Sequence, residues 1–247
     1  MTRPDIAAIN ALGPDEMARR LSGSAQDVAG FVREAAEAGS SEAQAVYAQM
    51  LLDGRSVRAD PPAAFHWFMV AARQEHLLAI NMVGRCFDLG WGVPVDKVQA
   101  AAWFKSAAVR GLDWGMYNYA TALALGQGVG EDKAAALDWL ERAAALGNAK
   151  AINFVGSFHE DGWVGPRDVA KAAACYARAA DGGDFRGQFN HARMLIEAGR
   201  VDEALPWLQR AGEGGNDRFR GQAAAWLARS ADDRLDVATD YFARREP

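Results

Sequence analysis

A repeat of 36 residues is the feature that most constrains what this chain can fold into. Residues of the same type recur at this step in several independent columns. The columns are Gly54, Gly90, Gly126 and Gly162; Asp60, Asp96, Asp132 and Asp168; Ala64, Ala100, Ala136 and Ala172; Ala71, Ala107, Ala143 and Ala179; and Trp67, Trp103 and Trp139, with Cys175 in the fourth place. Agreement between independent columns indicates a repeat architecture, in which each copy buries its apolar face against its neighbours.

Each copy has the pattern of a helix hairpin. Gly90 follows a stretch of helical periodicity, where a helix end favours a left-handed residue that Gly adopts without a steric clash. Asp96 follows a short loop and is a good N-cap, because its carboxylate accepts hydrogen bonds from the first turn of the next helix. That second helix, over residues 97–110, carries an apolar stripe at helical spacing: Ala100, Trp103, Phe104 and Ala107. The Trp column predicts that Trp103 and Trp139 are core residues between stacked hairpins.

Composition supports many short helices and argues against several other classes of protein. The chain of 247 residues has 52 Ala, and its 25 Gly and 8 Pro fit frequent turns better than one long coiled coil. A net charge of −5 gives no electrostatic reason to expect nucleic acid as a partner. No apolar run has the length of a membrane helix, and residues 1–13 lack the pattern of a signal peptide. Two unpatterned cysteines, Cys86 and Cys175, favour a reducing compartment, so we expect a cytoplasmic protein with free, buried thiols.

The repeat becomes irregular toward both ends of the chain. We expect an N-terminal cap with a partial repeat over residues 1–39 and four 36-residue repeats over residues 40–183. A shorter repeat is expected over residues 184–215, and a degenerate repeat with a cap over residues 216–247. Atypical terminal units are what a solenoid needs, since its outer faces meet water.

Several of these segments match a known repeat motif. They are Gly90-Trp91-Gly92-Val93 with Asp96, Gly126-Gln127-Gly128-Val129 with Asp132, Trp103-Phe104-Lys105-Ser106-Ala107-Ala108 with Gly111, and Trp139-Leu140-Glu141-Arg142-Ala143-Ala144 with Gly147. They resemble the Sel-one-like repeat (SLR) family, a relative of the tetratricopeptide repeat, over about residues 24–245. The resemblance implies an all-α fold, a right-handed α/α superhelix of about five to six stacked hairpins with partial capping units. Some secreted members pair cysteines in each repeat and are linked to β-lactam binding, but this chain lacks those pairs.

The sequence offers little support for catalysis, a metal site or a cofactor. The four His do not have the spacing of a metal motif, and we interpret them as solvated or packing residues. His159, Glu160 and Asp161 form an alternative acid–base or metal cluster, but adjacent helical residues point in different directions. The Gly-rich loops fit helix ends better than a phosphate-binding loop. We therefore expect no catalytic residue, no metal and no cofactor.

The resemblance places a binding surface on the first helix of each hairpin. By analogy with the tetratricopeptide pattern, the partner-binding residues of a concave groove are Asn81, Arg85, Trp114, Tyr117, Lys150, Asn153, Arg186, Phe189 and Arg193. Aromatic and Arg side chains are typical of binding hot spots, and the two Asn could bond an extended peptide. An acidic peptide with bulky apolar side chains would match this stripe. The alternative is that the aromatic residues pack against neighbouring helices.

The loop residues Trp91 and Trp163 provide a second candidate surface, since an exposed Trp can anchor a partner or fold over its own hairpin. Our functional hypothesis is a non-catalytic, bacterial-looking adaptor that binds a protein or peptide, with no nucleic acid and no membrane as partner. The alternative is a dedicated accessory or regulatory subunit of one enzyme or complex, and an enzyme is a more distant third.

Overall fold

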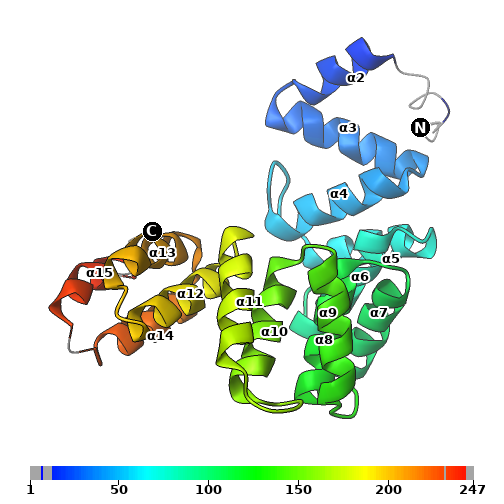
Figure 1. The fold of residues 1–247 in the computed structure, drawn as a ribbon. Coiled ribbons are helices and arrows are strands. Elements are labelled where there is room, and N and C mark those ends of the chain that lie inside the picture. The colour runs from blue at the N-terminus through cyan, green and yellow to red at the C-terminus, as the bar shows by residue number, and fades with distance from the viewer. Residues whose placement is uncertain (1–6, 8–12, 231, 243–247) are drawn as a thin grey trace. The chain divides into compact units, whose positions relative to one another are not determined.

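The computed structural model describes residue 7, residues 13–230 and residues 232–242. It therefore leaves out residues 1–6 and 8–12 of the expected N-terminal cap and residues 243–247 of the expected C-terminal cap. Helices joined by turns make up the described residues, which contain no strand, and this confirms the expected all-α class (Figure 1). The chain divides into two compact units, residues 1–131 and residues 132–247.

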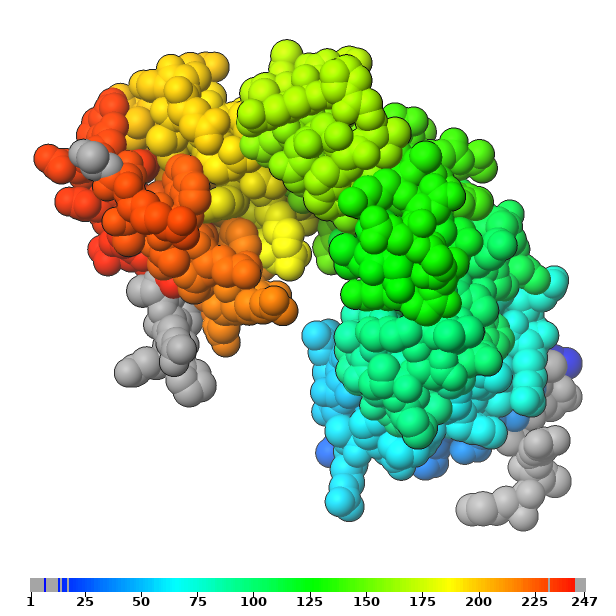
Figure 2. Space-filling view, turned by 90° about the horizontal axis from the view of Figure 1, so that it is seen from below, coloured from blue at the N-terminus to red at the C-terminus, as the bar shows by residue number. Residues whose placement is uncertain are grey.

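The first unit is a succession of short antiparallel helices. Their bounds are α2 (Pro14–Leu21), α3 (Ala25–Ala38), α4 (Ser41–Asp53), α5 (Pro61–Arg73), α6 (Leu77–Leu89), α7 (Lys97–Val109) and α8 (Asp113–Leu125). Each helix packs against the next along the chain, so that the hairpins α4–α5 and α6–α7 stack in sequence order. The gradual change of colour from cyan to green in Figure 2 follows this order.

The second unit repeats the same arrangement and ends differently. Its elements are α9 (Lys133–Ala145), α10 (Ala149–Asp161), α11 (Val169–Asp181), α12 (Phe185–Glu197), α13 (Val201–Gly214), α14 (Asp217–Leu227), the 3₁₀ turn η1 (Asp233–Leu235) and α15 (Asp236–Tyr241). Phe219, Leu235 and Phe242 join the buried core of α12 and α13. The last elements thus cover an apolar face that a following repeat would otherwise cover.

The repeated Gly and Asp form the helix ends that the sequence predicts. Gly54, Gly90, Gly126 and Gly162 are left-handed C-caps of α4, α6, α8 and α10. Asp60, Asp96, Asp132 and Asp168 each accept a backbone hydrogen bond of 2.9–3.0 Å from the third residue of the following helix. These two columns therefore set where each helix begins and ends.

A second Gly in two of the loops allows a close approach between backbones. Gly92 and Gly128 have φ of +74° and +72°. A Cβ at Gly92 would lie 2.1 Å from the carbonyl oxygen of Pro61, and one at Gly128 would lie 1.9 Å from that of Lys97. Pro61 and Lys97 begin α5 and α7, so each loop lies directly on the start of the preceding hairpin's second helix.

The centre of the core lies one residue later than the Trp column. Phe68, Phe104, Leu140 and Tyr176 are at most 5% exposed, whereas Trp103 and Trp139 are only half-buried. Trp103 therefore packs at the edge of the core and not at its centre, and Trp139 is likewise only partly buried. The aromatic rings of Phe104 and Tyr176 occupy the space beside Gly84 and Gly156, where a Cβ would lie 2.6 Å from a ring carbon.

The two cysteines differ in burial. Cys86 is buried in α6 and burial raises its thiol pKa to about 11. Cys175 is half-buried in α11, and burial also raises its thiol pKa. Both are free, and the expectation of a buried thiol holds fully for Cys86 only.

Candidate binding surface

The sequence-predicted binding residues lie in two separate groups, one in each unit. Asn81 and Arg85 belong to α6, and Trp114 and Tyr117 to α8, in the first unit. The second unit contains the others, on α10 and α12: Lys150, Asn153, Arg186, Phe189 and Arg193. The structure gives these residues three kinds of environment, namely buried, internally paired and exposed.

The two Asn are buried and already hydrogen-bonded. Asn81 and Asn153 are 5% and 9% exposed. Asn118 on α8 donates to Asn81 Oδ1 at 2.9 Å, and Asn190 on α12 donates to Asn153 Oδ1 at 2.9 Å. Their expected exposure toward a peptide was wrong, because they face the next first helix and join it to their own.

Arg193 is internally paired. Its guanidinium donates to Glu160 Oε2 at 2.6 Å and to Glu197 Oε1 at 3.0 Å. The Tyr176 hydroxyl donates to the same Glu160 oxygen at 2.7 Å. Burial of Glu160 favours its neutral form, but the hydrogen bonds from Arg193 and Tyr176 outweigh it and hold the Glu160 pKa below its ordinary value. The charge of Arg193 is therefore compensated within the second unit.

Phe189 contributes to packing. Its ring makes edge contacts with Phe219, Trp226 and Phe242, at centroid distances of 5.7, 5.5 and 6.1 Å. It is half-buried against the C-terminal core. The alternative interpretation, in which an aromatic residue packs against neighbouring helices, is the correct one here.

Among the other predicted residues, Trp114 and Arg186 are exposed, and Arg85, Tyr117 and Lys150 are half-buried. Trp114 is 41% exposed and meets the ring of Tyr117 edge to face at 6.3 Å. Arg186 is exposed, with its guanidinium 4.6 Å from the ring centre of Phe185, and Lys150 is half-buried. Trp114 and Tyr117 thus form a partly exposed aromatic pair on α8.

A polar pocket adjoins Tyr117 in the first unit. It lies among α6, α7 and α8 and has a volume of about 190 Å³. Its polar lining residues are Arg85, Asp88, Lys97, Tyr117, Asn118, Thr121 and Gln127, and its apolar lining residues are Ala100, Ala101, Phe104 and Ala122. Lys97 Nζ bonds both the carboxylate of Asp88 (2.6 Å) and its backbone oxygen (2.9 Å), and so closes one side.

Comparison with known proteins supports the repeat assignment. The Sel1 repeat family matches residues 41–76, 77–111, 115–148 and 149–184, more than half of the chain. The chain belongs to the Sel1 repeat family. Sel1 repeats generally serve as scaffolds for protein interaction. Comparison with the curated proteins finds none that matches significantly.

Solved structures show the same fold. A Sel1 repeat protein from Oxalobacter formigenes superposes with a TM-score of 0.76 at 25% identity, over 92% of this chain and 96% of that one. The protective antigen c5321 of uropathogenic Escherichia coli, with an SLR fold, gives 0.68 at 23% identity. That match covers 95% of this chain and 53% of c5321, so the chain spans about half of that protein. The immunity protein Pa5087 from Pseudomonas aeruginosa gives 0.57 at 19% identity, over 83% and 76% of the two chains.

The loop Trp residues of this Sel1 repeat protein fold over their own hairpins. The guanidinium of Arg85 lies 4.7 Å from the ring centre of Trp91. Trp163 packs against Phe158, with ring centroids 4.9 Å apart, and under the ammonium of Lys133 at 5.3 Å. Both Trp therefore stabilise their hairpins, although Trp163 remains 37% exposed.

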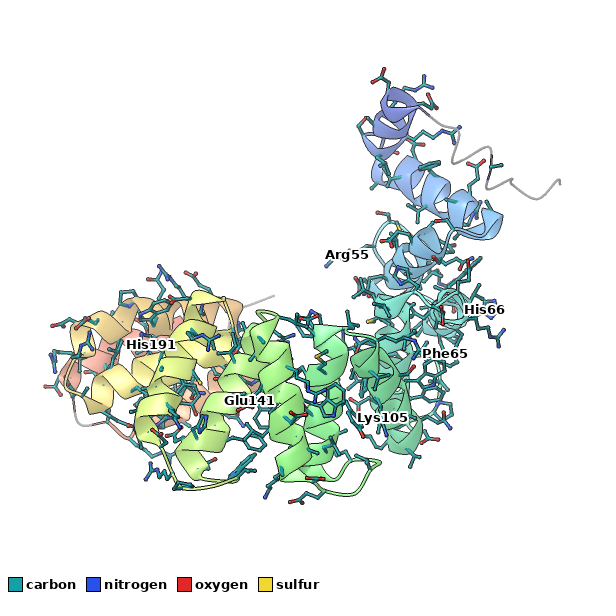
Figure 3. All side chains as sticks on the ribbon, turned by 45° about the vertical axis from the view of Figure 1, so that its right-hand side comes forward. Arg55, Phe65, His66, Lys105, Glu141 and His191 are labelled. Carbon is teal, nitrogen blue, oxygen red and sulfur yellow. The ribbon has the colours of Figure 1, made fainter. Side chains whose placement is uncertain are left out.

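The His residues and the acidic cluster considered for catalysis or metal binding make packing contacts or internal hydrogen bonds in this Sel1 repeat protein. Figure 3 labels His66 on α5 and His191 on α12. Their ring centroids lie 6.0 Å from that of Trp67 and 5.3 Å from that of Trp207, respectively. Burial lowers the His191 pKa. In the proposed cluster at residues 159–161, Glu160 is bound to Tyr176 and Arg193 instead. Among the described residues, no group of three or more His, Cys, Asp or Glu could hold a metal, and no helix is long and apolar enough to cross a membrane.

Sequence reasoning missed the residues that complete the pocket. Lys97, Asn118 and Gln127 were absent from the predicted surface, whereas the tetratricopeptide pattern already places Asp88 and Thr121 at concave positions, one turn from Arg85 and Tyr117. A step of 72 residues is the available signal, since Asn81 and Asn118 recur as Asn153 and Asn190.

Proposed function

We propose that this Sel1 repeat protein is a non-catalytic adaptor that binds an extended, acidic segment of a partner protein on its first helices. The observation that carries the proposal is the exposed Trp114 ring, which contacts the half-buried Tyr117 beside a polar pocket lined by Arg85. A bulky side chain of the bound segment would pack against the edges of the two rings, and an adjacent residue of that segment would reach the polar groups of the pocket. We place the binding in the cytoplasm, in line with the free thiols of Cys86 and Cys175.

The relative importance of the predicted residues changes with their environments. Trp114 and Tyr117 become the principal anchors, with Arg85 as the charged contact and with Arg186 and Lys150 as peripheral ones. The other predicted residues hold the first helices in place. Asn81, Asn153 and Arg193 do so through internal hydrogen bonds, and Phe189 does so through packing. Trp and Arg at the centre of an interface commonly account for most of its affinity.

The test selects ligands from a random dodecapeptide library on the purified full-length protein. The affinity of the best peptide is then measured by fluorescence anisotropy. Trp114→Ala should weaken binding by more than about twentyfold, the factor that corresponds to a hot-spot loss of about 2 kcal/mol. Trp163→Ala is the matched control, because it removes a Trp of similar exposure from the other candidate surface.

The two variants separate the competing surfaces. Loss of binding in Trp163→Ala with normal binding in Trp114→Ala would refute the first-helix site in favour of the loops. If the library yields no binding peptide while an intact folded partner binds, the peptide mode is wrong and the accessory-subunit alternative replaces it. Circular dichroism of each variant checks that the helical content is unchanged.

A further inference from the structure

The guanidinium of Arg85 has no carboxylate in hydrogen-bonding contact among the described residues, although its side chain is half-buried. Its contacts are the face of the Trp91 ring at 4.7 Å and the weak acceptor Met82 Sδ at 3.8 Å. Burial lowers the pKa of Arg85, which is the sign of a partly desolvated charge, and Arg remains protonated at any physiological pH.

The two carboxylates that influence Arg85 both have other partners. Asp88 is bound by Lys97 at 2.6 Å. Asp53 accepts a hydrogen bond from Gln49 at 2.8 Å and lies 3.8 Å from Arg55. Since Lys97 and Asp88 neutralise each other, the pocket wall retains one positive charge, that of Arg85.

The lining of the pocket suits an anion with two oxygen atoms. Arg offers a planar fork of N–H groups that matches a carboxylate. Asn118 uses one amide hydrogen on Asn81, and its second hydrogen is available to another acceptor. A volume of about 190 Å³ corresponds to roughly six water molecules, which is enough for one medium-sized side chain.

The second unit shows the same position closed by a charge pair. Seventy-two residues after Asp88, Phe104 and Thr121, the chain has Glu160, Tyr176 and Arg193. There Arg193 and Glu160 meet at 2.6 Å, and each side chain is 16% exposed. In the first unit, Thr121 replaces that Arg, and Arg85 stands where the second unit has Ser157. In the first unit the carboxylate at the counterpart position, Asp88, pairs with Lys97, and no carboxylate of the described residues is hydrogen-bonded to Arg85.

We infer that the pocket among α6, α7 and α8 binds the side-chain carboxylate of an Asp or Glu in a bound peptide, with Arg85 as its anchor. The inference rests on the proposed peptide-binding function and names the chemical group that the peptide must carry. Tyr117 lines the pocket and also touches Trp114, so an acidic side chain in the pocket places its neighbours along the exposed ring edges.

The test is an NMR titration of the ¹⁵N-labelled full-length protein with N-acetyl-glutamate methylamide at millimolar concentration. The Trp91 indole N–H and the Asn118 side-chain amide should shift with saturation. The glutamine analogue differs only in replacing the carboxylate by an amide, and it should bind at least tenfold more weakly. Arg85→Gln should weaken binding of the glutamate probe by a similar factor, whereas Arg73→Gln, at an exposed Arg on α5, should not.

Each outcome decides the inference. Equal binding of the two probes, or undiminished binding in Arg85→Gln, would overturn it. Binding of free glutarate as tight as that of the capped residue would overturn the peptide assignment in favour of a small free dianion. The comparison of the two probes uses the unaltered protein, so it decides even if Arg85→Gln does not fold. Failure of the peptide selection leaves this titration unaffected, which keeps the two proposals separately testable.

Discussion

Replacement of Arg193 by Gln should destabilise the second unit by about 2–3 kcal/mol. The variant loses a 2.6 Å ion pair to Glu160 in which both side chains are 16% exposed. Charge-assisted hydrogen bonds of this kind contribute about 1.5–3 kcal/mol. The second ion pair, to the more exposed Glu197, adds no more than about 0.5 kcal/mol.

The assay is urea unfolding followed by circular dichroism for the parent, Arg193→Gln, Glu160→Gln and the double variant. Because the double variant leaves no unpaired charge, it should be more stable than the sum of the two single effects predicts, with a coupling energy of about 1–2 kcal/mol. Glu197→Gln is the control and should change stability by no more than about 0.5 kcal/mol. Additive single effects would refute the assignment of this pair as an internal contact and return Arg193 to the binding surface.

The same pair should make stability depend on pH in a defined direction. The Glu160 pKa is lowered in the folded protein, so its contribution is fully present above the ordinary Glu pKa of about 4.3. The contribution is lost as the pH falls through the lower folded value. The stability difference between the parent and Arg193→Gln should therefore shrink below about pH 4. A difference that stays constant down to pH 3 would contradict this explanation.

Three further predictions follow from the core and the loops. Phe104→Ala should cost about 3–5 kcal/mol in urea unfolding, more than Trp103→Ala, because Phe104 lies in the centre of the core and Trp103 at its edge. Gly128→Ala should destabilise the first unit by more than about 1 kcal/mol, since φ is +72° and the new Cβ would meet a carbonyl oxygen. In native buffer at pH 8, a maleimide should label Cys175 before Cys86, whose pKa is raised to about 11 by burial; the reverse order, measured by mass spectrometry, would be inconsistent with the described burial.

The elements could be predicted from the sequence because their signals are local. A left-handed Gly at a helix end and an Asp that caps the next helix act within one turn of the chain, so Gly90 and Asp96 are sufficient to locate the hairpin loop. Which residue of each second helix lies at the centre of the core depends on the neighbouring helix, and a local signal does not show it. Trp103 and Phe104 are adjacent apolar residues, and the space left by Gly84 decides which of them is enclosed.

The binding surface depends on contacts between residues far apart in the sequence. Glu160 and Arg193 are 33 positions apart, and Asn81 and Asn118 are 37 apart, so a helical pattern shows the face but not the partner. Each of these contacts joins consecutive first helices, and it removes a polar group from the surface to which the pattern assigned it. Trp114 is 41% exposed and Arg85 is half-buried, so both keep some surface where the helical pattern placed it. That a ligand uses this surface stays a prediction.

The step of 72 residues separates structural positions from candidate functional ones. Positions that are identical in both units maintain the frame: Gly84 and Gly156 admit an aromatic ring, and Asn81 and Asn153 join neighbouring first helices. Positions that differ at this step are where the units can differ in function. Arg85 against Ser157 and Thr121 against Arg193 are two such differences: the second unit has an internal ion pair between Arg193 and Glu160, and the first has a pocket lined by Arg85. Thr121→Arg would place a guanidinium in the first unit at the position that Arg193 occupies in the second. The new guanidinium would compete with Lys97 for Asp88 and would fill part of the pocket. We therefore expect Thr121→Arg to abolish binding of the glutamate probe, while circular dichroism shows unchanged helical content.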